Sequence, residues 1–374
     1  MKLLTITFSV GLFFAQMFCP LSGVFALPNP GVSEKRIKIG LLIPDPKSTE
    51  AIHGAEMAIR KANAKAGSDH RSFQLVTRSM EGPWGTGSKE AVDLIFKEKV
   101  WAILGSHDGR NAHLVEQVCA KSRVVFLSAW ASDPTLSQAF VPSYFSCVPT
   151  DLQQADALIK EIYIKRKLNK IAIVSDNGYD AKQALGSFLK KIKLAGKAVP
   201  LQLFYDNSVK DFKNLFDQVN KSDINGIVIF GHPSDSRKLI QQIRQQKMGL
   251  SIFGSLSLLD GNEFSNEDPK DYEHLLLVYP ENLAGSKGLA FQNEFQRIYG
   301  KMPGVVAAYA YDGMSLILEA ARNADFDRGK IQKALSMINL KGVTGVIQFD
   351  DRGNRAGPVG LVEIKNGIPV PVGE

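Results

Sequence analysis

The sequence predicts an α/β protein of two Rossmann-like lobes, joined by several chain crossings, with a ligand cleft between the lobes. Runs of valine, isoleucine and leucine alternate with amphipathic stretches along most of the chain, as in parallel sheets covered by helices on both faces. The length of 374 residues suits two domains, each with its own core. An extended segment, Ser143–Pro149, interrupts the alternation where a first lobe would be complete.

The expected strands are short apolar runs bounded by turn residues: Ile37–Ile43, Phe73–Arg78, Val100–Leu104, Val124–Ser128, Ile171–Ser175, Val199–Tyr205, Gly226–Phe230, Ser251–Gly254 and Leu275–Tyr279. The expected helices carry apolar residues at helical spacing: Glu50–Ala66, Ser88–Lys99, Asn111–Lys121, Leu152–Lys167, Ala181–Ala195, Phe212–Asn220 and Asp235–Gln246.

Near the C-terminus, a pair of helices precedes a pair of strands. The helices are Gly304–Ala324 and Lys330–Met337, and the strands are Val343–Asp350 and Val359–Lys365. The helical pair has too few strands to form a domain alone, so we expect it to pack on the first lobe. The predicted lobes are then 27–147 with 281–347 and 151–277 with 350–374, and the crossings that form the multi-strand hinge lie near 148–150, 278–280 and 348–349.

Residues 1–26 have the pattern of a cleaved signal peptide. One charge, Lys2, precedes a long apolar stretch, and Val24–Ala26 supplies small residues suited to cleavage. A retained membrane anchor, the alternative, would need roughly 20 uninterrupted apolar residues, and polar residues such as Thr5 and Gln16 interrupt this stretch. We therefore expect an exported protein.

The charge and cysteine content narrow the choice of function. The formal net charge is +7 and is spread over helix faces, whereas a nucleic-acid binder would concentrate basic residues beside stacking aromatics. We expect no nucleic-acid partner. Cys119 and Cys147 remain after cleavage, and they could form a disulfide in an exported protein or lie buried and unpaired.

Four loops follow strands at their carboxyl ends, where open α/β sheets bind ligands. They are Gly105–Arg110, Ser128–Pro134, Asp176–Asp180 and Gly231–Asp235, two from each lobe. A longer loop, Met80–Gly87, carries Trp84. A closed cleft would bring loops from the two lobes together.

These loops supply groups for an amino-acid zwitterion. The backbone N–H of Gly109 at a helix start, the hydroxyl of Ser132 and the charge of Arg110 could hold a carboxylate. Asp108 or Asp176 could receive an ammonium group. The alternative is that Asp108, Asp133 and Asp180 only cap helices. His107 is either a cleft contact or a hydrogen-bonded neighbour of one, and Trp84 and Trp130 are expected as pocket walls.

The catalytic alternatives lack supporting motifs. His107 and His113 do not have the spacing of a helical metal-ligand pair, and no carboxylate motif completes them. Ser128 is not in a G-x-S-x-G turn, and the first strand is followed by Pro44-Asp45-Pro46, not by a phosphate-binding glycine loop. We expect no catalytic residues, no metal and no cofactor.

Taken together, these residues resemble the type 1 periplasmic binding proteins, in the branch of the leucine/isoleucine/valine-binding protein of ABC importers. The resemblance covers essentially the whole mature chain. Its markers are IKIGLLIP (37–44), HGAEMAIRKANAKAG (53–67), VWAILGS (100–106), VVFLSAWASDPTLS (124–137), KIAIVSDNGYD (170–180), AYAYDG (308–313) and GVTGVIQFDDRGNR (342–355).

The resemblance implies two lobes that close on a ligand about a hinge, and it assigns site residues by position. The first-lobe grip maps onto His107–Arg110 and onto Trp130, Ala131 and Ser132. The tyrosine that closes over the ligand maps onto Tyr179, and an aromatic position maps near His232.

Three departures from the family pattern concern the ligand. The serine that relatives use on the carboxylate corresponds to Gly109, and a small residue beside the ligand corresponds to Trp130. The second-lobe glutamate that pairs with the ammonium falls at about Leu256, and a buried charge without a partner would be unstable. Either Asp108 substitutes for the glutamate, or the ligand has no ammonium.

The expected function is that of a periplasmic solute-binding protein, which closes on an amino acid or a similar small polar ligand and presents it to the permease of an ABC importer. The alternative is a ligand-sensing protein that reports to a regulatory partner. We do not expect a receptor in one piece, because nothing transmembrane follows Glu374.

Overall fold

The computed structural model describes residues 36–65, 71–105, 107–206, 211–260, 269–280 and 282–373. The predicted signal peptide, 1–26, lies outside these residues. None of the helices in the described ranges is long and apolar enough to cross a membrane.

The first sheet is parallel and has the order β2-β1-β3-β4-β5. Its strands are β1 Arg36–Ile43, β2 Ser72–Ser79, β3 Ala102–Gly105, β4 Val125–Ser128 and β5 Tyr144–Ser146. β3 and β4 are buried at every position, which explains their continuous apolar sequence. The strand order places the ends of β1, β3 and β4 side by side.

The second sheet has the order β15-β14-β10-β9-β8-β6-β7. Its strands β6 Ile171–Asp176, β7 Leu201–Tyr205, β8 Gly226–Phe230, β9 Ser251–Gly254 and β10 Leu275–Val278 are parallel. β14 Leu361–Lys365 and β15 Ile368–Pro371 are antiparallel additions at one edge. β15 was not expected, because it contains two prolines, which only an edge strand tolerates.

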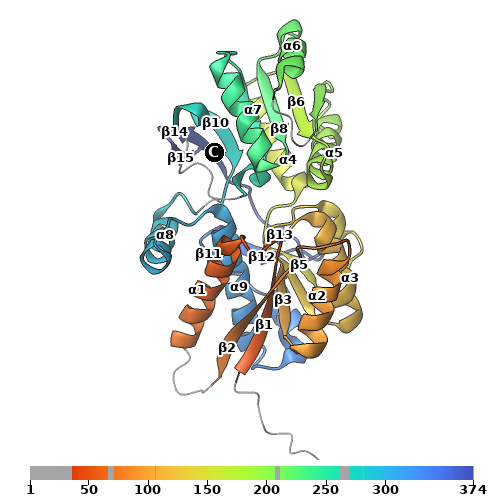
Figure 1. The fold of residues 1–374 in the computed structure, drawn as a ribbon, viewed down its shortest axis with the longest axis vertical. Helices are drawn as coiled ribbons and strands as arrows, with labels where there is room; N and C mark the ends of the chain where they lie inside the picture. Colours follow the sequence, from red (N-terminus) through yellow and green to blue (C-terminus); the bar gives the residue numbers. More distant parts are fainter. Residues whose placement is uncertain are drawn as a thin grey trace, which may run out of the picture. The chain divides into compact units, whose positions relative to one another are not determined.

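The helices cover the sheets in the alternation that the sequence predicts (Figure 1). They are α1 Thr49–Ala64, α2 Thr86–Val92, α3 Gly109–Ser122, α4 Asp151–Ile159, α5 Tyr179–Leu194, α6 Lys213–Lys221, α7 Pro233–Gln245, α8 Ser286–Tyr299, α9 Val305–Asn323 and α10 Ile331–Ser336. π-helical turns at Asp93–Lys97 and Lys160–Lys165 extend α2 and α4. α8 was not expected, although Phe291 and Phe295 lie at helical spacing and are buried.

The late helices pack on the first lobe, as expected. α9 lies against α1 (Figure 1), and the two backbones touch at Gly54. A Cβ atom on Gly54 would lie 2.2 Å from the carbonyl oxygen of Ala307. Since no side chain fits in that space, glycine is required for the two helices to approach so closely.

A small antiparallel sheet, β11-β12-β13, occupies the late part of the chain. β11 Leu340–Gly342 and β12 Gly345–Phe349 form a tight hairpin, and β13 is Arg355–Ala356. The expected single strand Val343–Asp350 is thus interrupted at its start by a turn. The buried guanidinium of Arg355 donates to the carbonyls of Cys147 and Thr344, at 3.0 and 2.8 Å.

Cys119 and Cys147 are buried and unpaired. The sequence left open a disulfide or two buried, unpaired cysteines, and the structure has the second arrangement. Burial raises the pKa of both thiols above their usual range, so neither is a reactive thiolate.

Candidate ligand-binding site

A pocket of about 890 Å³ lies where loops from the two large sheets meet. The first sheet contributes the loop after β1, the start of α1, and residues after β3 and β4. The second sheet contributes the loops after β6 and β8 and the turn after β9. The lining residues are Pro44, Asp45, Lys47, Ser48, Thr49, Glu50, His107, Asp108, Arg110, Trp130, Asp176, Asn177, Gly178, Tyr179, Asp180, Ala181, Gly231, His232, Pro233, Ser257, Asp260, Lys301 and Val306.

Six of the predicted ligand-binding residues line this pocket: His107, Asp108, Arg110, Trp130, Tyr179 and His232. They come from strand-end loops of both sheets. The lining of this pocket does not include the other six residues that the sequence offers as ligand-binding candidates, which are Trp84, Gly109, Ser128, Ala131, Ser132 and Leu256.

Trp84 is a surface residue rather than a pocket wall. It is 69% exposed, and the guanidinium of Arg110 lies over its ring, 5.1 Å from the centroid. The indole therefore interacts with Arg110 through a cation–π contact.

The hydroxyls of Ser128 and Ser132 have partners within the protein. Ser128 is buried and donates to the carbonyl of Ala131, which is itself 4% exposed. Ser132 donates to Oδ1 of Asp151 at 2.7 Å. A contact of the Ser132 hydroxyl with a ligand carboxylate would have to replace this bond, and it stays a prediction.

Leu256 belongs to the core. It is 2% exposed, and its N–H donates to Oε1 of Gln154 at 2.9 Å. Asp260, at the end of the 3-10 turn Leu256–Leu259, lines the pocket together with Asp176 and Asp180 of the same lobe. It lies just beyond the position that the resemblance assigns to the family's glutamate.

Gly109 begins α3, and its N–H donates to the carboxylate of Asp180 across the pocket at 3.0 Å. A Cβ atom on Gly109 would lie 2.9 Å from Oδ1 of Asp180 and 3.0 Å from Cβ of Asp133. The close approach of the two loops therefore requires glycine here. The helix start predicted to bind a ligand carboxylate is instead bonded to a carboxylate of the protein.

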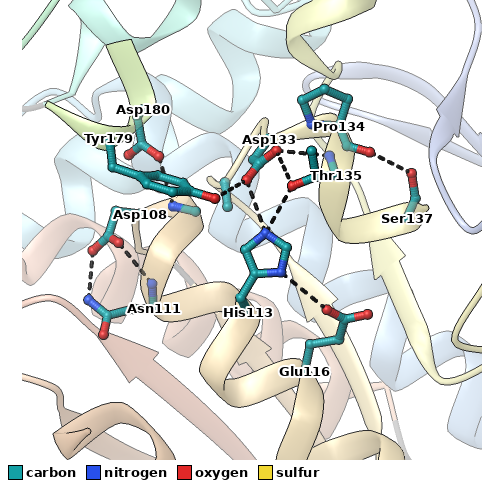
Figure 2. Close-up of polar contacts among 12 residues, drawn as sticks. Asp108, Asn111, His113, Glu116, Asp133, Pro134, Thr135, Ser137, Tyr179 and Asp180 are labelled. Carbon is teal, nitrogen blue, oxygen red and sulfur yellow. Dashed lines mark hydrogen bonds and ion pairs between the residues drawn. The ribbon is translucent and has the colours of Figure 1, made fainter. Parts of the chain in front are cut away.

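A second contact joins the loop after β6 to the loop after β4 (Figure 2). The hydroxyl of Tyr179 donates to Oδ2 of Asp133 at 2.8 Å, and His113 lies 3.1 Å from the same oxygen. Hydrogen bonds to Asp133 and Glu116 raise the pKa of His113 to about 9. Burial raises the pKa of Asp133, but bonds from His113, Thr135 and Tyr179 outweigh burial and leave that pKa below its usual value.

The predicted helix-capping role holds for two of the three aspartates. Asp108 caps α3 by accepting from the N–H and the side-chain amide of Asn111. Asp133 caps the 3-10 turn Pro134–Ser137. Asp180 lies in the first turn of α5, whose cap position is Gly178, so its carboxylate is not a cap.

Asp176 links two loops of the second sheet. Its carboxylate accepts from the N–H of Gly178 at 2.7 Å and from the N–H of His232 at 2.6 Å. Asp176 is 3% exposed, and these bonds hold the loops after β6 and β8 together at the pocket edge.

His107 is buried at 2% exposure and lines the pocket. Burial lowers its pKa, so the ring is neutral at pH 7. Its Nδ1 lies 3.2 Å from the carbonyl oxygen of Asp108, which can only accept, and this assigns the proton to Nδ1. Its Nε2 is then an acceptor, and it has no hydrogen-bond partner among the described residues.

Several lining residues were missed by sequence reasoning: Asp45, Ser48, Thr49, Glu50, Ser257, Asp260, Lys301 and Val306. The first four follow β1 at its carboxyl end, so the rule used for the other loops would have found them. Lys301 and Val306 are brought in by the packing of α9 on α1, which is not a local sequence signal. In the described ranges, no group of histidine, cysteine and acidic residues could hold a metal ion.

The fold and the pocket define a class of protein: a two-lobed α/β binding protein whose site lies at the carboxyl ends of parallel strands. The family model of the periplasmic binding proteins matches residues 36–367. The chain belongs to this family, whose members are solute-binding proteins and not enzymes.

Individual relatives are distant. The chain is 22% identical over 310 residues to the Leu/Ile/Val-binding protein of Citrobacter freundii, covering 81% of this chain and 82% of that protein. It is 24% identical over 271 residues to glutamate receptor 2.2 of Arabidopsis thaliana, covering 69% of this chain but only 29% of the receptor.

Solved structures share the fold. The substrate-binding protein LivJ of Streptococcus pneumoniae, in complex with isoleucine, has a TM-score of 0.77 at 20% identity, covering 90% of this chain and 100% of LivJ. A solute-binding protein of R. palustris, in complex with benzoate, has a TM-score of 0.77 at 18% identity, covering 90% of this chain and 96% of that one.

Proposed function

We propose that the protein is the exported solute-binding component of an ABC importer. It binds an amino acid or a similar small polar ligand in the pocket between its lobes, closes on it, and presents it to a membrane permease. The observation that carries the proposal is the pocket of about 890 Å³, lined by strand-end loops of both large sheets. Pockets of this size are typical of small-molecule sites.

The contacts between loops of the two sheets support closure as part of this function. The Tyr179–Asp133 and Asp180–Gly109 bonds both cross the pocket edge. The proposal includes the lobe boundaries and the hinge near 148–150, 278–280 and 348–349. A ligand that touches both lobes would stabilise the closed arrangement in proportion to its differential affinity for that arrangement.

Ligand titration monitored by tryptophan fluorescence and thermal unfolding tests the proposal. Trp130 lines the pocket and meets Tyr309 edge to face at 6.4 Å, so its emission should change on closure. A panel of amino acids, small carboxylates and amines should contain a ligand that stabilises the protein by about 2.7 kcal/mol at a hundredfold excess over Kd. The Trp130→Phe variant should keep the stabilisation and lose most of the fluorescence change.

The fluorescence and thermal data have a clear negative outcome. If no member of the panel shifts either signal, and no small molecule is found by mass spectrometry of the natively purified protein, the solute-binding proposal fails. An uptake assay in cells that lack the protein then tests the permease partnership separately.

A further inference from the structure

The pocket has more carboxylates than cations. Six acidic residues line it, namely Asp45, Glu50, Asp108, Asp176, Asp180 and Asp260, against three lysines and arginines, namely Lys47, Arg110 and Lys301. Two of these cations interact with other groups: Arg110 lies over the ring of Trp84, and Lys301 donates to the hydroxyl of Thr49 at 3.0 Å.

Three of the pocket carboxylates, those of Asp108, Asp176 and Asp180, are bonded to neutral groups. Asp108, Asp176 and Asp180 accept from backbone or side-chain amides. Within the described ranges, neither these three nor Asp45 or Asp260 forms an ion pair within 4.0 Å. Asp180 and Asp260 line the pocket and are exposed at its surface, so a cationic ligand can reach their carboxylates.

The acidic residues interact with one another across the pocket. Burial and the charge of Asp108 raise the pKa of Asp180 to about 7, with Asp133 and Asp260 acting in the same direction. Burial also raises the pKa of Asp260 to about 6; His232 and Arg237 oppose this shift, and Glu50 and Asp45 add to it. Since Asp108 belongs to the first sheet and Asp180 and Asp260 to the second, this repulsion acts between the lobes.

The carboxylates themselves favour a ligand that has N–H donors. A charge-assisted hydrogen bond from an ammonium or guanidinium N–H to a carboxylate is stronger than a neutral one. A carboxylate or a quaternary ammonium offers no such donor. His107 adds no contact of this kind, because its Nε2, which has no partner among the described residues, is buried over Gly105 beside the ring of Phe126.

The N-terminus of α3 leaves no room for a ligand carboxylate at its first N–H. That N–H is bonded to Asp180, so an incoming carboxylate would have to displace Asp180 and would meet Asp108 beside it. The position that the sequence predicts for the ligand's anionic end is therefore the least favourable place for it.

We propose that the ligand is an organic cation with an N–H donor, an amine or a guanidine, which binds between the carboxylates of Asp108, Asp180 and Asp260 and needs no carboxylate of its own. This inference rests on the proposed solute-binding function and specifies its ligand class. The cation would relieve the repulsion between the lobes and so link binding to closure.

Calorimetric titration with matched ligands tests the inference. The probes are arginine and agmatine, which differ by the carboxylate, putrescine, tetramethylammonium, leucine and benzoate. Agmatine should bind at least as tightly as arginine, while leucine, benzoate and tetramethylammonium should bind at least about a hundredfold more weakly. Raising the salt concentration should weaken agmatine binding.

Variants of the pocket carboxylates provide a second test of the inference. Asp260→Asn and Asp180→Asn should each weaken agmatine binding about tenfold or more. Asp351→Asn removes the same charge from an exposed turn and should leave affinity unchanged. Thermal unfolding of each variant establishes that it is folded.

The outcomes separate the two proposals. Tight binding of leucine or benzoate with no binding of agmatine would overturn the cation inference and leave solute binding intact. Equal agmatine affinity in Asp260→Asn, Asp180→Asn and Asp351→Asn would also overturn it. Binding of none of the probes, together with no copurifying small molecule, would contradict both proposals.

Discussion

Two groups of acidic side chains lie on either side of the contact between the loops of the two sheets, and they differ in what balances their charge. In the first group, Asp133 and Glu116 share His113, whose ring lies 3.1 Å from one carboxylate and 3.6 Å from the other. In the second group, Asp108, Asp180 and Asp260 face the pocket and, within the described ranges, have no cation within 4.0 Å. Asp133 and Glu116 are buried, whereas Asp180 and Asp260 are exposed at the pocket surface, and only the first group has a histidine to balance its charge.

The difference distinguishes carboxylates that stabilise the fold from carboxylates that are placed to bind a ligand. A carboxylate whose charge is met by a neighbouring histidine and whose oxygens accept hydrogen bonds stabilises the fold. A carboxylate whose neighbours are other carboxylates does not, and it is retained at some loss of stability, as at many functional sites. Removing residues from the first group should therefore damage the fold, and removing residues from the second should damage binding.

The largest effect is expected for Asp133→Ala. This change removes the partner of His113, the acceptor of Tyr179 and the cap of the turn Pro134–Ser137. The free energy of unfolding should fall by about 3 kcal/mol, because a partly buried charge loses its partner. Denaturant unfolding measures it. As a control, Asp327→Ala removes an exposed cap with an ion pair to Lys330 and should cost less than about 1 kcal/mol. Equal losses would remove the distinction between the two sites.

A smaller effect, confined to closure, is expected for Gly109→Ala. The added Cβ would lie 2.9 Å from Oδ1 of Asp180, and such overpacking costs about 1–3 kcal/mol. Since the closure proposed above would form this contact, ligand affinity should fall about tenfold or more while the unfolding temperature of the ligand-free protein changes little. Gly186→Ala is the matched control, because a Cβ there meets nothing within 4 Å. Unchanged affinity in Gly109→Ala would mean that the contact is absent from the liganded state.

The free energy of unfolding should depend on pH through both His113 and Asp180. Their pKa values are both raised, but the protein stabilises the charged form of His113 and disfavours the charged form of Asp180. The pKa of His113 is raised from 6.5 to about 9, so its contribution to stability is present below about pH 6.5 and is lost as the pH rises through 9. Replacing it in His113→Gln should flatten the decline of the unfolding temperature between pH 7 and pH 9. An unchanged decline would show that another group titrates there.

The smallest effect is expected for Asp180→Asn. The pKa of Asp180 is raised from 3.8 to about 7, so its charged form is disfavoured in the folded protein and stability falls as the pH rises from about 4 to 7. Asparagine keeps an acceptor for the N–H of Gly109 and has no charge. Asp180→Asn should therefore be more stable than the parent protein at pH 8 and equal to it at pH 4, as measured by thermal unfolding. Lower stability at pH 8 would show that the carboxylate is stabilising.

Local patterns predict the sheets well and the pocket only in part. The strands β3, β4, β6 and β8 are buried at every position, so their apolar runs are unambiguous. The loops after them could be placed at one sheet edge by the rule for parallel strands. What each loop contacts could not be deduced, because the Asp180–Gly109 and Tyr179–Asp133 bonds join residues 71 and 46 positions apart.

Asp260 shows why a family pattern did not locate every site residue. The position of the family's acidic residue falls at Leu256, which here begins a 3-10 turn whose three leucines are buried. The carboxylate that lines the pocket belongs to Asp260, which follows this turn. The contact of Trp84 could not be predicted either, since its partner, Arg110, lies in the first turn of α3, which follows a different strand.

The contact between α1 and α9 at Gly54 has a consequence for how the site can adapt to ligands of different size. Because the two backbones touch there, the beginnings of both helices, with Thr49 and Glu50 on one and Val306 on the other, form a wall that cannot yield without separating the helices. Accommodation must then come from the facing side, where Tyr179, His232 and Asp260 are carried on turns. The first lobe would then limit the size of the ligands that fit, and the second lobe would adjust to ligands of different size.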